Sequence, residues 1–211
     1  GGGKIFASTD AGETWVESST GLPANFSVAY FALKGSTIYA GSSVISAAKG
    51  VYKSADNGLN WVSDGSSFVG SGRIDGITAN DVGVFVSTDL NGVFRSNGND
   101  TVWTKINPGT ATNFATAVLA TSSNLFIGIT GYLYRADQNG NNWDSARVGL
   151  PTPTAGTAIR TLAASGSSVI LGFASHGIFR STNNGTSWFK SADGLKAERI
   201  NGILASNGSL F

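Results

Sequence analysis

The sequence predicts an all-β fold built from one repeated unit, and three observations support that prediction. Five tryptophans recur along the 211 residues at intervals of 46, 42, 40 and 45. Between them lie short alternations of β-branched and aromatic residues, which are typical of strands, separated by turns rich in Gly, Ser and Asn. No segment has the 3.6-residue spacing of an amphipathic helix. Four short strands in each repeat of this length are typical of a blade of a β-propeller.

The first two strands of each repeat are predicted from a segment that aligns five times without gaps. In Val28–Tyr39 an apolar run is followed by a polar turn and a second short apolar run, which is a hairpin pattern. The matching segments are Ile74–Phe85, Ala115–Phe126, Ile159–Ile170 and Ile200–Phe211.

The third strand is predicted from a five-residue segment in which apolar and polar residues alternate. Its copies are Lys4–Ser8, Gly50–Ser54, Gly92–Ser96, Tyr132–Ala136 and Gly177–Ser181. A fourth short strand begins at each tryptophan.

The chain begins in a third strand and ends in a second strand, so its two ends complement each other. We therefore expect one closed five-bladed propeller of four-stranded antiparallel blades, in which the N-terminal third and fourth strands pair with the C-terminal first and second strands. The expected blades are about 27–72, 73–113, 114–157, 158–198, and 199–211 together with 1–26. The whole of 1–211 is predicted to be a single domain.

Each tryptophan ends an eight-residue segment with a common pattern. Ser8–Trp15 reads Ser-Thr-Asp-Ala-Gly-Glu-Thr-Trp, and Ser54–Trp61 and Ser181–Trp188 follow it closely. The segment 96–103 exchanges the positions of Asp and Gly. The segment 136–143 keeps Gly140 but has Gln138 at the Asp position.

This pattern resembles the Asp-box, or BNR repeat, of sialidases and of bacterial surface propellers. The resemblance implies a turn between the third and fourth strands, in which Ser and Asp bond their own backbone, Gly takes a positive φ and Trp packs between sheets. The residues it assigns to this structural role are Ser8, Asp10, Gly12, Trp15, Ser54, Asp56, Gly58, Trp61, Trp103, Gly140, Trp143, Ser181, Asn183, Gly185 and Trp188. The family includes enzymes, lectin-like binders and assembly factors, so the resemblance does not select a function.

Composition excludes several classes of function. With 14 Lys and Arg against 13 Asp and Glu, the net charge is +1, which argues against a nucleic-acid surface. The chain has no Cys and a single His, so it offers no thiolate or multi-histidine metal centre, and we expect neither metal nor cofactor. No apolar run reaches the length of a membrane span. Low charge and the absence of Cys and Met favour an exported monomer that is extracellular, cell-surface or periplasmic.

Candidate binding residues lie where the first strands begin, at the mouth of the expected central channel. The aligned positions there do not repeat: they are Ala29, Asp75, Thr116, Arg160 and Asn201. The predicted ligand-binding residues are Arg73, Asp75, Arg160, His176, Arg199, Asn201 and Phe68. They predict a pocket for an anionic or hydroxyl-rich ligand; the alternative is a water-filled mouth with Arg–Asp pairing.

The function predicted first is a non-catalytic module that binds a glycan or a protein, and no catalytic residue is assigned. A sialidase-like or other glycoside hydrolase is the alternative. Sialidases need three Arg, a Tyr–Glu pair, an acidic Asp and an Arg-Ile-Pro segment, whereas Arg73-Ile74 and Arg199-Ile200 are not followed by Pro. An assembly scaffold that resembles the photosystem-assembly propellers is a further alternative.

Overall fold

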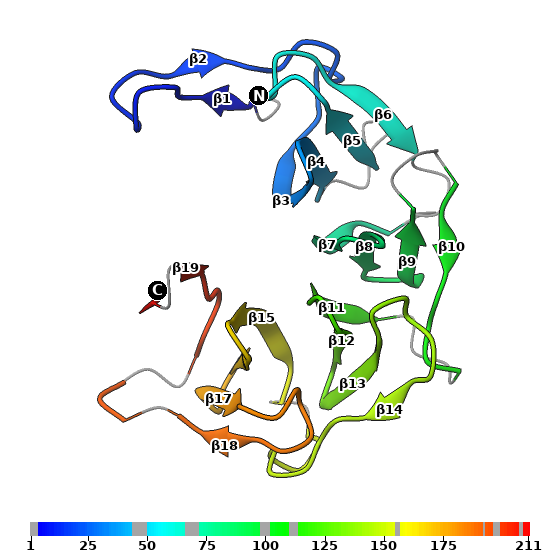
Figure 1. The fold of residues 1–211 in the computed structure, drawn as a ribbon, viewed down its shortest axis with the longest axis vertical. Coiled ribbons are helices and arrows are strands. Elements are labelled where there is room, and N and C mark those ends of the chain that lie inside the picture. Colours follow the sequence, from blue (N-terminus) through cyan, green and yellow to red (C-terminus); the bar gives the residue numbers. More distant parts are fainter. Residues whose placement is uncertain are drawn as a thin grey trace. The chain divides into compact units, whose positions relative to one another are not determined.

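The computed structural model describes residues 4–43, 50–65, 72–97, 102–109, 114–154, 157–191, 193–195, 199–206 and 209–211. Every regular element in these ranges is a strand, as Figure 1 shows. The described part of the chain holds no helix long and apolar enough to cross a membrane. The chain divides into two compact units, Gly1–Lys105 and Ile106–Phe211.

The first unit contains one strand pair and two four-stranded antiparallel sheets. The pair joins β1 (Phe6–Ala7) to β2 (Val16–Glu17). The first sheet has the order β3 (Val28–Lys34), β4 (Thr37–Ser42), β5 (Val51–Ser54) and β6 (Val62–Gly65). The second has the order β7 (Ile74–Asn80), β8 (Gly83–Thr88), β9 (Gly92–Ser96) and β10 (Thr104–Lys105).

The second unit repeats this plan with two four-stranded sheets and a final pair. The first sheet consists of β11 (Ala115–Ala120), β12 (Asn124–Ile129), β13 (Tyr132–Asp137) and β14 (Asp144–Ser145). The second consists of β15 (Ile159–Ser165), β16 (Ser168–Phe173), β17 (Ile178–Ser181) and β18 (Phe189–Lys190). The pair joins β19 (Ala205–Ser206) to β20 (Ser209–Leu210).

The predicted hairpins and the order of strands within each repeat are confirmed. Each four-stranded sheet follows chain order, because every strand pairs with its sequence neighbour in antiparallel fashion. In the first hairpin the turn uses Gly35 at φ 58°, a left-handed conformation that favours glycine. Closure of the chain into a ring stays a prediction.

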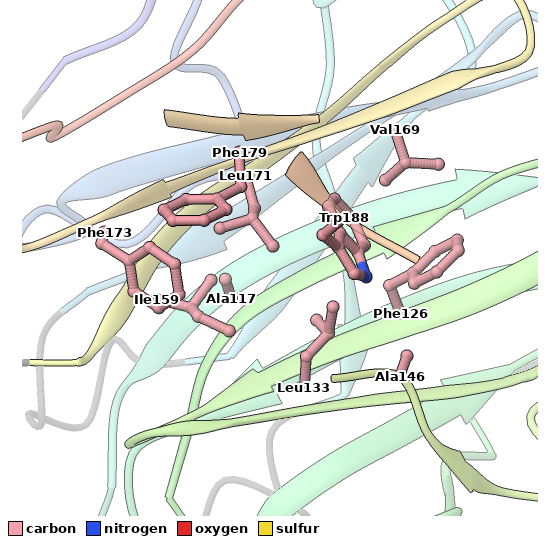
Figure 2. Close-up of a cluster of buried hydrophobic side chains, with 10 residues drawn as sticks. All are labelled: Ala117, Phe126, Leu133, Ala146, Ile159, Val169, Leu171, Phe173, Phe179 and Trp188. Atoms are coloured by element: carbon pink, nitrogen blue, oxygen red, sulfur yellow. The ribbon is translucent and has the colours of Figure 1, made fainter. Parts of the chain in front are cut away.

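The cores lie where neighbouring sheets of one unit face each other. In the first unit Tyr39 and Val51 pack with Ile74, Val86 and Phe94 of the next sheet. In the second unit Phe126 and Leu133 pack with Leu171, Phe179 and Trp188, as Figure 2 shows. The second strand of each sheet is the most deeply enclosed; every residue of β8 and β16 is buried. Burial on both faces explains why these strands read as nearly continuous apolar runs.

Candidate functional site

The predicted binding positions coincide with a structural irregularity that all four complete sheets share. The first strand of each sheet gains one residue against its partner, between Val28 and Tyr30 in β3, and the same shift recurs in β7, β11 and β15. The extra residues are Ala29, Asp75, Thr116 and Arg160. A β-bulge re-aims its side chain and interrupts the ladder, and bulges are common beside binding sites.

In the first unit Arg73 and Asp75 lie together, as their positions before and at the bulge predict. Arg73 Nε donates to Asp75 Oδ1 at 2.8 Å, and Asp89 Oδ2 lies 3.9 Å from the same nitrogen. The backbone N–H of Arg73 also donates to Asp89 Oδ1 at 2.7 Å. Hydrogen bonding and the negative charge of Asp75 raise the pKa of Arg73. The guanidinium remains about half exposed, with 53% of its side chain accessible.

Two further residues join this cluster that the sequence did not single out. Asp89 follows β8 and is brought to Arg73 by the β7–β8 hairpin, a contact that depends on register. Tyr30 lies in the adjoining sheet; burial, and then the charge of Asp75, raise the pKa of its hydroxyl, while Arg73 opposes this. In the sequence Tyr30 reads as one residue of an apolar strand, so only the structure shows that Asp75 and Arg73 influence its hydroxyl.

In the second unit three predicted basic residues lie on segments that the backbone ties together. Ala174 N–H donates to Ala158 O at 2.9 Å, and Ile200 N–H donates to Phe173 O at 3.0 Å. These bonds join the segments that contain Arg160, His176 and Arg199.

The side chains of Arg160, Arg199 and His176 differ in the contacts that they make. Arg160 is exposed and makes no side-chain hydrogen bond within the described ranges. Arg199 Nε donates to Asn201 Oδ1 at 3.2 Å, which leaves its charge without a neutralising carboxylate in that contact. The ring centroids of His176 and Phe173 lie 5.7 Å apart in an edge-to-face arrangement, and His176 Nδ1 is 3.1 Å from Ser175 Oγ. The two arginines of this group therefore carry positive charge that the contacts named here do not neutralise.

Two other residues near the starts of the first strands, Thr116 and Phe68, are not part of this basic group. Thr116 Oγ1 donates to Ile159 O at 2.7 Å and lies 3.2 Å from Gly128 O, so this bulge residue ties β11 to β15. Its role is structural. Phe68 lies outside the described residues.

Two of the boxes form turns that their own Ser and Asp side chains close. In Ser54–Trp61, Gly58 N–H donates to Ser54 Oγ at 2.8 Å, and Asn60 N–H donates to Asp56 Oδ1 at 2.9 Å. The hydrogen bonds from Asn60 and Ser54 lower the pKa of Asp56 to about 2. Asp10 has the same arrangement, with Thr14 as the main donor, and its pKa is also about 2. These carboxylates are engaged by their own turns.

The third intact box shows that charge is not required. Asn183 Oδ1 accepts from Ser187 N–H at 2.9 Å and from Ser181 Oγ at 2.8 Å. An amide oxygen therefore replaces a carboxylate oxygen in an otherwise equivalent turn.

The fourth box corrects the sequence alignment by one residue. The motif places Gln138 at the Asp position, but in the structure Asp137 makes the corresponding bonds: its Oδ1 accepts from Asn139 N–H at 2.9 Å and from Asn141 N–H at 3.0 Å. These bonds lower the pKa of Asp137. The turn still passes through Gly140 at φ 81°. The shift by one residue is possible because the backbone N–H groups of the turn need an acceptor, and the Asp137 carboxylate is close enough to accept from them.

The box tryptophans differ in how they are covered. Trp61 and Trp188 are buried, and Trp103 Nε1 donates to Asp64 O at 2.7 Å. Trp143 is partly buried. Trp15 departs from the expectation that every box tryptophan packs between sheets: 62% of it is exposed, and its Nε1 donates to Gly12 O of its own turn at 3.0 Å.

Comparisons with known proteins support the fold. No family model and no curated protein matches the chain. Among solved structures, YCF48 bound to D1 peptide is 18% identical over 96% of this chain and 66% of that one, with a TM-score of 0.70. The fold is a β-propeller.

Two further solved structures are similar to this chain at comparably low sequence identity. The extracellular domain of BT4673 from B. thetaiotaomicron is 18% identical over 87% of this chain, with a TM-score of 0.65. The GH74 enzyme of Niastella koreensis is 15% identical over 88% of it, with a TM-score of 0.63. This chain spans a quarter of the length of the first and a third of the second. At such identities the likeness concerns the fold alone.

Proposed function

We propose that this propeller is a non-catalytic binding module, exported from the cell, whose ligand is an acidic segment of a peptide or protein. The observation that supports it most is the basic group of the second unit. Arg160 is exposed there, and the backbone ties its segment to those of His176 and Arg199. Charged hydrogen bonds from guanidinium groups to carboxylates are strong and directional, which suits recognition of an acidic segment.

The contrast between the bulge positions and the boxes supports binding at the former. The boxes recur with the period of the repeat, and their polar atoms are engaged by their own turns. The bulge residues share a backbone geometry but differ in chemistry, from Ala29 to Arg160. A shared backbone that presents different side chains is the arrangement a specific site uses.

The geometry around Arg73 argues against the alternative of a two-carboxylate glycoside hydrolase. In such enzymes the bond to be cleaved lies between the two carboxyl groups. Here Asp75 Oδ1 and Asp89 Oδ2 lie 2.8 Å and 3.9 Å from Arg73 Nε, so both carboxylates are close to the same cation. This pairing with an arginine does not leave the two carboxylates free to act as acid and nucleophile.

Structural neighbours add support for a protein ligand and for export. One is recorded with the D1 peptide, another comes from a nidogen/laminin complex, and a third is an extracellular domain. These partners and this location belong to those proteins; the same fold makes a peptide or protein ligand and an extracellular location reasonable proposals here. An assembly scaffold would use the same kind of surface.

The experiment is a calorimetric titration with an acidic peptide, a neutral peptide of equal length, and acidic and neutral oligosaccharides. We expect the acidic peptide to bind, and Arg160→Ala to weaken it about tenfold or more, because a charged hydrogen bond contributes about 1.5 to 3 kcal/mol. Lys190→Ala is the matched control, since it removes an exposed cation from β18.

The outcomes separate the alternatives. Binding of oligosaccharide but not of peptide would replace the protein ligand with a glycan. Release of reducing sugar from a glycoside substrate would contradict the non-catalytic assignment. An affinity that Arg160→Ala and Lys190→Ala reduce equally would show that binding depends on overall charge rather than on the basic group.

A further inference from the structure

The segment around Asn201 repeats the segment around Asp75 with one change. Residues 73–77 read Arg-Ile-Asp-Gly-Ile, and residues 199–203 read Arg-Ile-Asn-Gly-Ile. The second copy thus has a side-chain amide where the first has a carboxylate, and the amide is followed directly by glycine.

Both copies make the same side-chain contact. Arg73 Nε donates to Asp75 Oδ1 at 2.8 Å, and Arg199 Nε donates to Asn201 Oδ1 at 3.2 Å. The first contact is an ion pair, whereas the second leaves the guanidinium charge uncompensated. Conversion of the Asn201 amide into a carboxylate would therefore make the second site equivalent to the first.

An Asn-Gly pair can undergo this conversion without an enzyme. The backbone nitrogen of the glycine loses its proton to a base in water and attacks Cγ of the asparagine, and the side-chain nitrogen leaves as ammonia. Water then opens the resulting five-membered succinimide at either carbonyl, which gives aspartate or isoaspartate; one water is consumed and one ammonia released. Glycine favours the attack because it has no Cβ to obstruct the approach.

The backbone around Asn201 leaves the attacking nitrogen accessible. Asn201 and Gly202 are both exposed and lie outside the regular strands. Ile200 N–H and Ile203 N–H donate to acceptors in β16 and β15 at 3.0 Å and 3.1 Å. No described residue accepts a hydrogen bond from the intervening Gly202 N–H. Its proton can therefore be lost to solvent.

The other Asn-Gly pairs of the described ranges are protected. In each of them the glycine is buried. Three of these glycines donate their N–H within a turn: Gly58 to Ser54 Oγ at 2.8 Å, Gly185 to Ser181 Oγ at 2.9 Å, and Gly140 to Asp137 O at 2.9 Å. Such a bond must break before the nitrogen can lose its proton and approach Cγ, so the box turns shield their own asparagines.

Arg199 favours the attack at Asn201. Its Nε donates to Oδ1, the oxygen on which negative charge develops as Gly202 N bonds to Cγ. A cationic donor directed at a developing oxyanion lowers the barrier of an acyl transfer. Arginine remains protonated in the mildly alkaline solutions that promote loss of the backbone proton.

We propose that Asn201 is a deamidation site, at which the succinimide route replaces its amide by a carboxylate that pairs with Arg199. In the aspartate product the segment becomes identical in sequence to residues 73–77. The new negative charge lies in the basic group of the second unit, so the modified protein binds an acidic ligand more weakly. This last consequence rests on the proposed function, whereas the modification itself does not.

The first test incubates the folded protein at mildly alkaline pH and follows deamidation by tandem mass spectrometry of tryptic peptides, with a zero-time sample to correct for digestion. Fragment spectra separate Asn201 from Asn207, which lies in the same tryptic peptide. We expect Asn201 to react about tenfold or more faster than Asn57 or Asn184, because the latter must first lose a hydrogen bond in a buried turn. Equal rates, or no reaction at Asn201, would overturn the proposal.

Two variants test the chemistry. Gly202→Ala adds a Cβ that meets nothing within 4 Å, so it keeps the fold while it obstructs the attack, and it should slow the reaction about tenfold or more. Arg199→Ala should slow it roughly threefold to tenfold, since it removes one exposed donor to the oxyanion. A rate at Asn201 that neither variant changes would overturn the mechanism.

The consequence for binding is measured by calorimetric titration with the acidic peptide. Incubated wild type and Asn201→Asp should bind about threefold to tenfold more weakly than fresh wild type, whereas incubated Gly202→Ala should retain its affinity. An Asn201→Asp variant that binds as tightly as fresh wild type would overturn the neutralisation of the basic group. Fresh wild type that does not bind the peptide would refute the proposed function alone, because the mass measurement decides the modification without a ligand.

Discussion

Trp61→Ala is the sharpest test of the role assigned to the boxes. Trp61 is 3% exposed and belongs to one buried cluster with Ile5, Phe26 and Ala40. Ile5 directly precedes β1, Phe26 precedes β3, and Ala40 lies in β4. Its indole N–H donates to Ser18 O at 2.8 Å. The substitution therefore removes a large buried aromatic and leaves a buried carbonyl without its donor.

The magnitude follows from these two losses. Truncation of a buried tryptophan to alanine costs about 3 to 5 kcal/mol, including the cavity that remains. Trp61→Phe keeps most of the apolar contact but leaves Ser18 O without a donor, so it should cost about 1 to 3 kcal/mol. Urea unfolding followed by circular dichroism measures both, because the midpoint shifts in proportion to stability.

The matched control is Leu59→Ala, which lies in the same turn and removes an apolar side chain that is 68% exposed. It should change the stability by less than about 0.5 kcal/mol. A cost for Trp61→Ala of less than about 1 kcal/mol, or one no larger than that of Leu59→Ala, would mean that the indole is not part of a core.

Two more predictions concern the turns. Asp56→Asn should be tolerated and Asp56→Ala should not, because Asn183 makes the equivalent bonds with an amide; thermal melts compare the two variants. The fold lowers the pKa of Asp56 from 3.8 to about 2, so its carboxylate stabilises the protein above pH 4, and this contribution is lost as the pH falls towards 2. Asp56→Asn should accordingly lose less stability than the wild type between pH 4 and pH 2, and an unchanged acid profile would contradict this assignment. Gly149→Ala should destabilise strongly because its Cβ would overlap Trp188 O, whereas Gly166→Ala, at φ 58° in open space, should cost far less; equal unfolding midpoints would refute the close approach.

Part of the site was predictable because its residues lie on repeated strands. Aligning the first strands singled out Asp75 and Arg160, which the structure shows to be bulge residues. Asp89 was missed because only the β7–β8 hairpin brings it to Arg73, and Tyr30 was missed because it lies on the neighbouring sheet. Nothing in the local pattern around either residue marks it as a member of a charged cluster.

The sequence by itself determined the strands, their order and most of the box turns. These features depend on hydrogen bonds and alternation within a few residues, as in the bond from Gly58 to Ser54 four residues away. Such interactions form wherever the local residues allow them. The same kind of local hydrogen bond is therefore made by Asn183 in place of Asp, and by Asp137 one residue before the Asp position.

Only the tertiary structure decided which of the similar box motifs has a buried tryptophan. Trp15 and Trp61 end nearly the same eight residues, yet one is 62% exposed and the other 3%. The difference arises because the hydrogen bond from Trp61 to Ser18 spans 43 residues and needs a preceding hairpin to receive it. Burial is a property of the neighbouring sheet rather than of the motif, so a repeat sequence specifies the tryptophan but not the surface that encloses it.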